Sequence, residues 1–320
     1  MAELEPEIVT SLDAGAPGEL AVSEVTGGLF NRVLRVEAPS RVLYYKRFTE
    51  RAKLGAFPPL PTSPWQRWLV ASRCQANASR CAAGGEVSVP PLVRADEARC
   101  SVLMEAAAGT LLYDAIVAEG TSSAVRRAVG RVVVWLARVH REPPRELPTL
   151  VEHSAAFKRY KVDLQYERLL PELGAAREAG ARFVERYLAL ERHLLHGDIN
   201  SRNILVNGDG AVAIIDFEQG QVGEGAYDVA YLVSELVIAC LRDGTDPAPV
   251  VDELWALYVR HAAPEPEPPA HMREFRTHLA FQVLYRLIGP SRQTWTGHLT
   301  DDAKAVVHTW SLREANRWLA

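Results

Sequence analysis

The most informative segment of this 320-residue chain reads Leu195-His196-Gly197-Asp198-Ile199-Asn200-Ser201-Arg202-Asn203-Ile204-Leu205-Val206, and it resumes after a turn with Ile214-Ile215-Asp216-Phe217-Glu218. Residues 204–206 and 211–215 have the apolar composition of two short strands, and Asn207-Gly208-Asp209-Gly210 is a turn cluster. If Val206 pairs with Ala211, Asn203 lies opposite Ile214, shortly before Asp216. At ~3.3 Å per strand residue, the side chains of Asn203 and Asp216 would lie roughly 7 Å apart, a spacing that suits an oxygen-coordinated cation.

The loop that enters this hairpin carries a further carboxylate, Asp198. Asp198, the amide of Asn203 and the strand-end carboxylate of Asp216 together supply the groups that phosphoryl transfer from a metal–nucleotide complex requires. The segment therefore predicts the active site of a kinase, or the remains of one.

The pattern His-x-Asp-x-x-x-x-Asn, a hairpin, and then Asp-Phe-Glu resembles the catalytic core of the aminoglycoside phosphotransferase/choline kinase-like family, within the protein-kinase-like fold. His196-Gly197-Asp198 replaces the His-Arg-Asp of protein kinases, and Asp216-Phe217-Glu218 replaces their Asp-Phe-Gly, so the resemblance is to small-molecule kinases. A second similarity, to lipopolysaccharide sugar kinases, lies in Tyr44-Tyr45-Lys46-Arg47-Phe48 and in the Asp-Ile-Asn-x-x-Asn run. The resemblance is specific from about Lys46 to Glu235.

This resemblance implies an α+β, bilobal protein-kinase-like fold, with a small antiparallel-sheet N-lobe (residues 1–105) and a larger, mainly helical C-lobe (residues 106–320). The N-lobe would carry a phosphate loop and a strand lysine, and the C-lobe the catalytic loop, metal site and acceptor pocket. The implied activity is transfer of the γ-phosphate of ATP or GTP, with Mg²⁺, to a hydroxyl of an aminoglycoside, amino-alcohol, sugar or natural product. The alternatives are a lipopolysaccharide or lipid-linked sugar kinase at the membrane surface and a nucleotide-binding pseudokinase.

The resemblance also assigns roles to the matched residues. Asp198 would accept the hydrogen bond of the acceptor hydroxyl as the catalytic base, and Asn203 and Asp216 would ligate Mg²⁺. Glu218 is either a second metal ligand or a hydrogen-bonding partner within the loop. His196 would brace the catalytic loop rather than handle protons.

The first hundred residues predict a strand-rich N-lobe. Strands are expected at residues 20–25, 33–37, 42–48 and 101–105. Gly27 and Gly28 stand where the kinase fold lays a loop over the nucleotide phosphates, and glycine lets backbone N–H groups approach an anion closely. Lys46 is interpreted as the lysine that contacts the inner phosphates, against the alternative of a solvated edge-strand lysine. Met104 and Glu105 lead into the interlobe hinge, where the base of the nucleotide would bind.

One expected partner is missing from the sequence. In the kinase fold the strand lysine pairs with a helix glutamate, yet residues 51–85 contain neither Asp nor Glu. Counting back from Val87-Ser88-Val89-Pro90 places the expected position near Gln75. Either Gln75 hydrogen-bonds Lys46 as a neutral partner, or the helix is shifted and Glu50 or Glu86 serves.

The same acid-free segment allows two interpretations. Its charged residues are all basic, and tryptophans at positions 65 and 68 add apolar bulk. The segment could be a solvated helix face with its tryptophans packed on the N-lobe. It could instead be a docking surface for an anionic partner, either a phosphorylated acceptor or the headgroups of an acidic membrane. Membrane association is therefore possible but not favoured.

Later segments predict the helical C-lobe. Helices are expected at residues 125–140, 181–195, 225–241, 251–262, 273–288 and 301–319. The helix at 225–241 is apolar almost all round, which predicts the buried centre of the lobe. At its start, Asp228 would cap the helix or hold the backbone of the catalytic loop. His140 lies on an apolar face and is interpreted as a core histidine. Beyond Arg242 the polar residues mix both signs, so the acceptor cannot be named.

Composition excludes several classes of protein. A net charge of −4 argues against a nucleic-acid binder. No apolar run approaches ~18 residues and the N-terminus lacks a signal-peptide pattern, which predicts a soluble, cytoplasmic protein. The four cysteines form no Cys-x-x-Cys pair and are interpreted as free thiols. The implied partners are a small-molecule hydroxyl acceptor and a nucleotide, with no nucleic acid.

Overall fold

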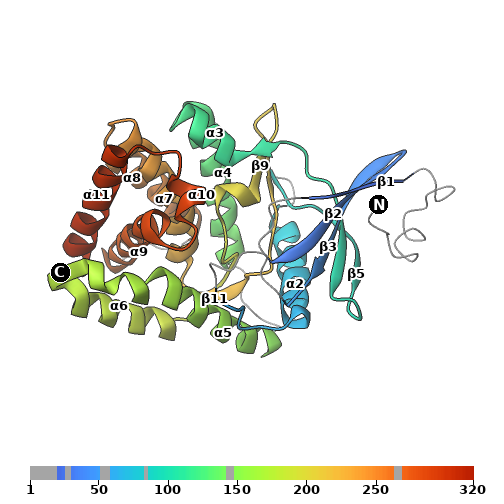
Figure 1. The fold of residues 1–320 in the computed structure, drawn as a ribbon, viewed down its shortest axis with the longest axis horizontal. Helices are drawn as coiled ribbons and strands as arrows, with labels where there is room; N and C mark the ends of the chain where they lie inside the picture. The colour runs from blue at the N-terminus through green and yellow to red at the C-terminus, as the bar shows by residue number, and fades with distance from the viewer. Residues whose placement is uncertain (1–19, 26–29, 51–57, 83–85, 142–147, 263–268) are drawn as a thin grey trace.

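A computed structural model of the chain describes residues 20–25, 30–50, 58–82, 86–141, 148–262 and 269–320. Its first part is a five-stranded antiparallel sheet in the order β1-β2-β3-β6-β5. The strands are β1 (Ala21–Glu24), β2 (Asn31–Ala38), β3 (Arg41–Phe48), β5 (Leu92–Asp96) and β6 (Ser101–Glu105). Figure 1 shows this sheet on the right of the molecule and the helices of the C-lobe on the left. The fold is the predicted bilobal α+β arrangement.

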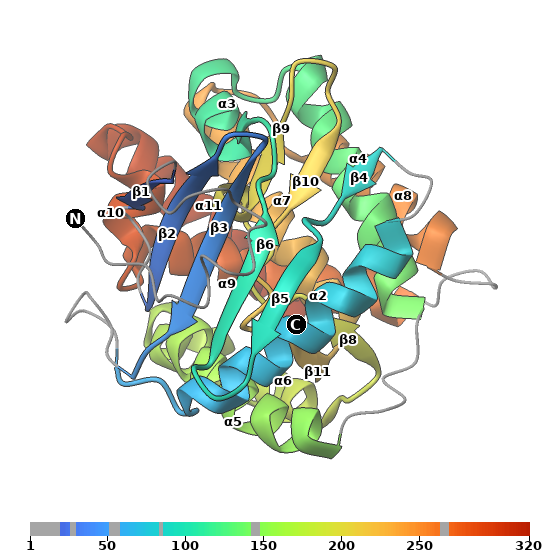
Figure 2. The ribbon, with the colours of Figure 1, turned by 90° about the vertical axis from the view of Figure 1, so that its right-hand side faces the viewer.

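Alternation along β3 directs two sets of side chains to opposite faces of the sheet. Leu43 and Tyr45 are buried in a cluster on one face. Phe48, on the other face, packs against Trp68 of helix α2 (Pro64–Ala82), which lies along the sheet (Figure 2). Because side chains alternate with a period of two, Lys46 shares the face of Phe48. The sheet therefore presents Lys46 to the helical lobe.

A second sheet joins segments that are far apart in sequence. Its order is β4-β10-β9-β7, and its strands are β4 (Val87–Ser88), β7 (Thr110–Leu111), β9 (Ile204–Val206) and β10 (Val212–Ile214). A two-stranded sheet pairs β8 (His193–Leu195) with β11 (Gln221–Gly223). These short strands hold the segments on either side of the predicted site in place.

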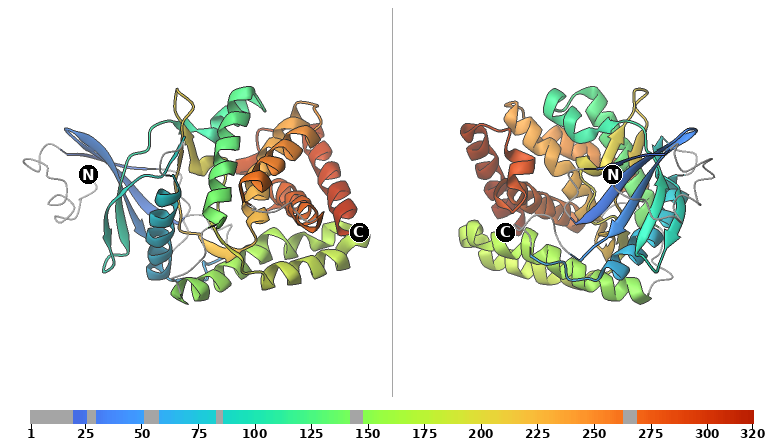
Figure 3. Two further views of the ribbon diagram at one scale, coloured as in Figure 1. Left: turned by 180° about the vertical axis from the view of Figure 1, so that it is seen from behind. Right: turned by 45° about the vertical axis from the view of Figure 1, so that its right-hand side comes forward.

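The helices of the C-lobe pack around α7 (Gly225–Arg242), in which every residue from Gly225 to Cys240 is buried. The remaining elements are α3 (Leu112–Glu119), α4 (Ser123–Arg141), α5 (Pro148–Gln165), η2 (Glu167–Ala176), α6 (Arg177–Ala189), η3 (Ser201–Asn203), α8 (Ala248–Ala262), α9 (Pro269–Ile288), α10 (Arg292–Thr296) and α11 (Asp301–Leu319). Figure 3 shows α5 and α6 along the lower edge of this lobe. The buried centre predicted from the apolar segment 225–241 is confirmed.

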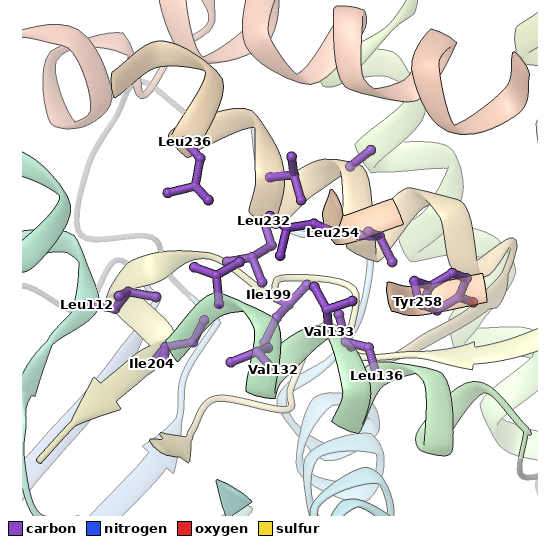
Figure 4. Close-up of a cluster of buried hydrophobic side chains, with 14 of the residues drawn as sticks. Leu112, Val132, Val133, Leu136, Ile199, Ile204, Leu232, Leu236, Leu254 and Tyr258 are labelled. Atoms are coloured by element: carbon purple, nitrogen blue, oxygen red, sulfur yellow. The ribbon is translucent and has the colours of Figure 1, made fainter. Parts of the chain in front are cut away.

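The core of this lobe also reaches the catalytic segment. Leu232 and Leu236 of α7 lie near Val132 and Val133 of α4 and near Ile199 (Figure 4). Ile199 is fully buried, and it follows Asp198 directly. Burial of a large apolar side chain contributes about 1.5–3 kcal/mol, so Ile199 anchors the loop that carries Asp198.

Two local expectations were wrong. In the hairpin, Val206 pairs with Val212 rather than Ala211, because Asn207 N–H donates to the carbonyl of Ala211 (3.0 Å) and closes a longer turn. The helix expected at 181–195 begins earlier, at Arg177, and ends at Ala189, before strand β8.

Other expectations agree with the structure. The strand predicted at 101–105 is β6, and all four cysteines are free thiols. Among the described residues, no helix has both the length and the apolar character needed to cross a bilayer.

Candidate active site

Two carboxylates of α7 hold the backbone of the catalytic loop (residues 196–203). Asp228 is fully buried and accepts hydrogen bonds from the amides of His196 (2.7 Å) and Gly197 (3.0 Å). Of the two roles predicted for Asp228, the structure therefore shows the second. Glu235, two turns further along, accepts a bond from the amide of Ser201 (3.0 Å) and another from its hydroxyl. Charge-assisted hydrogen bonds of this kind are strong, so the loop is fixed from the C-lobe.

Gly197 occupies a position that excludes a side chain. Its φ of 77° lies in the left-handed region, and a Cβ built there would be 2.0 Å from the carbonyl oxygen of Gln219. Glycine adopts this conformation without a steric penalty. The packing explains why this chain carries His-Gly-Asp, because an arginine at this position would collide with the neighbouring loop.

His196 braces the loop, as the resemblance implied. Its Nε2 donates to the carbonyl of Ile215 (3.1 Å), and its Nδ1 accepts from the amide of Asp198 (3.3 Å). Burial lowers the pKa of His196 despite the nearby carboxylate of Asp228. The ring is therefore neutral, which agrees with one nitrogen donating and the other accepting.

Asp198 is surrounded by hydrogen-bond donors. Its Oδ2 accepts from Asn203 Nδ2 (3.1 Å) and from Gln219 Nε2 (3.2 Å), and its Oδ1 lies 3.2 Å from Lys161 Nζ. These contacts orient a carboxylate that is partly exposed, as a proton acceptor for a bound hydroxyl must be.

Lys161, on α5, is a site residue that sequence reasoning missed. It is buried, also donates to the carbonyl of Gly197, and lies over the ring of Tyr231 (5.2 Å to the centroid). Burial lowers the pKa of Lys161, and the carboxylate of Asp198 opposes that effect. One signal could have found it. The chain contains only five lysines, so each of them is a candidate site residue on rarity alone.

Asp216 lies at the start of the loop of residues 216–219, called here the Asp-Phe-Glu loop. Its Oδ1 accepts a hydrogen bond from Lys46 Nζ at 2.7 Å. Burial raises the pKa of Asp216, but the charge and hydrogen bond of Lys46, together with His196 and the backbone of Glu218, outweigh burial and lower the pKa overall. Its φ of 70° is unusual for a residue with a side chain. Such conformations concentrate at functional sites, where surrounding contacts maintain them.

The hairpin brings Asn203 beside this loop. The amide of Ile215 donates to the carbonyl of Asn203 (3.0 Å), so Asn203 is nearer to Asp216 than the predicted pairing would have placed it. The side-chain nitrogen of Asn203 is engaged by Asp198, which leaves its oxygen as a donor to a cation. This donor set fits Mg²⁺, which prefers a few protein oxygens together with phosphate oxygens. In the described part of the chain, no three His, Cys, Asp or Glu residues could hold a metal by themselves.

Glu218 faces the N-lobe. It is buried, and its Oε1 accepts from Asn31 Nδ2 of β2 (2.7 Å) while its Oε2 accepts from Arg67 Nη1 of α2 (3.2 Å). Lys46 Nζ lies 3.6 Å from Oε1. Glu218 is thus a hydrogen-bonding partner, but across the lobes rather than within its own loop.

The predicted pairing of Gln75 with Lys46 is wrong. Gln75 is buried, and its Nε2 donates to the carbonyl of Pro90 (2.7 Å). The alternative Glu86 pairs instead with Arg131 (2.7 Å), and Glu50 is exposed. The acid-free helix turns Arg67 toward the site, so its register differs from the expected one.

The other nucleotide residues stay predictions. Gly27 and Gly28 lie outside the described residues. Met104 and Glu105 end strand β6, and the amide of Glu105 donates to the carbonyl of Pro91 (3.1 Å). The N–H of Glu105 is therefore engaged within the N-lobe. A nucleotide base would have to bind to other backbone groups of this segment.

Two polar residues of the segment beyond Arg242 have structural partners within the C-lobe. Arg286 is fully buried and donates to Ser234 (2.7 Å) and Glu235 (3.0 Å). His278 is buried and bonds the hydroxyl of Tyr166 (2.6 Å). These residues stabilise the C-lobe, and neither identifies the acceptor.

A family model described as "Phosphotransferase enzyme family" matches residues 22–275 of the chain. Among similar solved structures is a choline kinase from Cryptosporidium parvum Iowa II, with a TM-score of 0.60 at 10% identity, covering 98% of this chain and 96% of that one. A Plasmodium vivax ethanolamine kinase gives 0.55 at 14% identity, covering 95% and 85%. The streptomycin–ATP–APH(2")-IIa ternary complex gives 0.52 at 12% identity, covering 99% and 97%. At these identities the likeness shows the fold alone. No curated protein sequence matches the chain.

Proposed function

Because the chain belongs to the phosphotransferase enzyme family, we propose that it transfers the γ-phosphate of ATP or GTP to a hydroxyl of a small molecule such as an amino-alcohol, aminoglycoside, sugar or natural product. One observation carries this proposal. Lys46 of β3 contacts Asp216, the neighbouring Ile215 bonds the carbonyl of Asn203, and Asn203 contacts Asp198, so that groups from three separate segments lie in succession. Phosphoryl transfer needs a phosphate-binding cation, oxygen ligands for a metal and a proton acceptor in this order.

In this reaction Asp198 is the group that meets the acceptor. It accepts the proton of the acceptor hydroxyl as the bond from that oxygen to the γ-phosphorus forms. The bond from the γ-phosphorus to the β–γ bridging oxygen breaks, and the nucleoside diphosphate leaves with that oxygen. Lys161 and Gln219 hold the carboxylate in the orientation that this transfer requires.

The nucleotide side of the site is assigned to the other three residues. Lys46 would contact the phosphates, while Asn203 and Asp216 would hold Mg²⁺. When bound, the metal neutralises charge on the phosphate oxygens. We also propose that residues 1–105 carry the nucleotide phosphate-binding elements and that residues 106–320 carry the catalytic loop and the acceptor pocket.

The structure reduces the case for a pseudokinase. That alternative arose because α2 supplies no acid to Lys46. Lys46 nevertheless has two carboxylates within 4 Å, those of Asp216 (2.7 Å) and Glu218 (3.6 Å). Lys46 is therefore held by acidic groups although the helix glutamate is missing.

A kinase assay tests the proposal directly. The purified chain is incubated with ATP or GTP and Mg²⁺ against a panel of hydroxylated metabolites that includes choline, ethanolamine, aminoglycosides and sugars. Mass detection of one added phosphate on an acceptor is the expected result, and Asp198→Asn is the matched inactive control. If the chain binds nucleotide but shows neither phosphate transfer nor slow nucleotide hydrolysis, the pseudokinase is favoured instead. If the acceptor is a lipid-linked sugar, the membrane-surface enzyme is favoured.

A further inference from the structure

Helix α2 carries only basic charged residues, and one of them is placed unlike the others. Arg67 is 1% exposed, whereas Arg73 and Arg80 of the same helix are exposed. A cation in the first turn of a helix is opposed by the helix dipole, and a buried charge is costly unless it is paired. The buried positive charge of Arg67 therefore requires compensation by a negatively charged group outside the helix.

Glu218 supplies that compensation from the other lobe. Arg67 Nη1 contacts both Glu218 Oε2 (3.2 Å) and Asn31 Oδ1 (3.0 Å), and Nη2 donates to the carbonyl of Thr49. Asn31 in turn donates to Glu218 Oε1 (2.7 Å). Both oxygens of Glu218 are thus engaged by N-lobe groups.

The arrangement is balanced in charge. Two cations, Lys46 and Arg67, face two carboxylates, Asp216 and Glu218, and both cations lie near the ring of Phe48. Burial lowers the pKa of Lys46, but the two carboxylates outweigh burial and raise it overall, so that the lysine stays charged. Removing one member of such a set leaves an uncompensated buried charge.

We propose that Glu218 is the carboxylate that positions Lys46, and that Arg67 is the positioning residue that holds Glu218 in place. Helix α2 thus acts on Lys46 indirectly, because its own Arg67 holds the carboxylate of Glu218, which comes from the opposite lobe. The proposal rests on the proposed function, because that function gives Lys46 its contact with phosphates. It also takes Glu218 out of the set of metal ligands, since its oxygens already have partners.

The test is a double-mutant cycle on nucleotide affinity. Calorimetry measures binding of ATP and of GTP with Mg²⁺ to the full chain, to Arg67→Met and to Lys46→Met, and to the chain with both changes. Arg67→Met is expected to weaken binding about tenfold, because Arg67 acts on the nucleotide only indirectly, through Glu218 and Lys46. In the Lys46→Met background the same change should have little further effect, because the residue through which Arg67 acts is gone.

Two further variants separate positioning from folding. Arg67→Lys keeps the charge and should restore part of the affinity, and Arg73→Met, on the exposed face of the same helix, should leave it unchanged. If Arg67→Met unfolds the chain, the double variant Arg67→Met with Glu218→Gln takes the place of Arg67→Met in the cycle. This double variant removes both charges of the pair together.

Different outcomes overturn different claims. If the unmodified chain binds neither nucleotide, the proposed function fails. If the unmodified chain binds nucleotide, two results overturn the inference alone. One is that Arg67→Met binds nucleotide equally well. The other is that the Arg67→Met change costs as much affinity in the Lys46→Met background as in the unmodified chain. A changed Mg²⁺ requirement in Glu218→Gln would return Glu218 to the metal ligands and would also overturn the inference.

Discussion

The two loops of the site are held by opposite halves of the molecule. In the described part of the chain, the catalytic loop is held from the C-lobe, chiefly by Asp228, Glu235 and Lys161. The carboxylates of the Asp-Phe-Glu loop are fixed from the N-lobe, by Lys46, Arg67 and Asn31. The first loop can therefore be formed whatever the position of the N-lobe, whereas the second is complete only when the lobes meet. Changes in the two loops should consequently affect different steps.

The largest effect is expected at the catalytic loop. Asp198→Asn keeps the shape of the side chain but removes the proton acceptor, so turnover should fall by about 10²–10⁴-fold while nucleotide affinity changes little. Steady-state kinetics and calorimetry on the same preparation measure the two quantities. Near-normal turnover, or a parallel loss of nucleotide affinity, would contradict the separation of the two loops.

Changes in the Asp-Phe-Glu loop should instead weaken nucleotide binding. Asp216→Ala removes a metal carboxylate and the partner of Lys46, so Mg²⁺-dependent nucleotide binding should weaken by about a hundredfold or more. Asn203→Ala should cost less, because a neutral amide stabilises a cation less than a carboxylate does. Calorimetry with and without Mg²⁺ gives the order, and equal, negligible losses in both variants would refute the metal assignment.

A smaller effect is expected at Lys161. Lys161→Met removes the donor to Asp198 Oδ1, so kcat should fall about tenfold with little change in nucleotide affinity, in proportion to one lost charge-assisted hydrogen bond. Lys158, one turn earlier on α5, is a matched control because it is also buried but donates to the carbonyls of Leu188 (3.1 Å) and Leu190 (2.5 Å). Lys158→Met should alter stability rather than kcat. Equal kinetic losses in both variants would show that Lys161 only supports the helix.

A last comparison distinguishes the two lobes by the pH dependence of their stability. Burial lowers the pKa of His278 in the C-lobe to about 3, below its unfolded value of about 6.5. The unfolded chain therefore binds more protons as the pH falls below 6.5, and the C-lobe should lose about 2 kcal/mol of stability between pH 7 and pH 5 from this group. Asp216 has a lowered pKa, so its ion pair weakens only below its ordinary range near pH 4.

Urea unfolding at pH 7 and at pH 5 measures the contribution of His278. The difference between the two pH values should be smaller in His278→Gln than in the unmodified chain. Nucleotide affinity at pH 5 should be retained as long as the chain is folded. An unchanged pH dependence in His278→Gln would show that His278 is not the group responsible.

Local patterns in the sequence predicted the elements but not the contacts between lobes. Strand β6 and helix α7 were identified because alternation and apolar character are properties of consecutive residues. The hairpin register was wrong by one residue because it depends on the turn, and the bond from Asn207 to Ala211 cannot be read from composition. The motif residues Asp198 and Asp216 were found because their spacing is characteristic.

The partners of Lys46 could not be predicted in the same way. Arg67 and Glu218 are 151 residues apart, and neither carries a local signal that names the other. The absence of acid in α2 was visible in the sequence, but it suggested a neutral or shifted partner near the helix rather than one supplied by the opposite lobe. Only the three-dimensional arrangement shows that Arg67 contacts Glu218, whereas Gln75 is buried against the carbonyl of Pro90.

The close contact of Gly197 with Gln219 bears on how this site could be re-engineered. The two loops are anchored on different lobes, yet their backbones touch at a point where no side chain fits. A His-Arg-Asp segment transplanted into this chain would displace the carbonyl of Gln219 and, with it, the position of Asp216. Neither loop is therefore an independent module, and a chimera with another kinase would have to exchange both as one cassette.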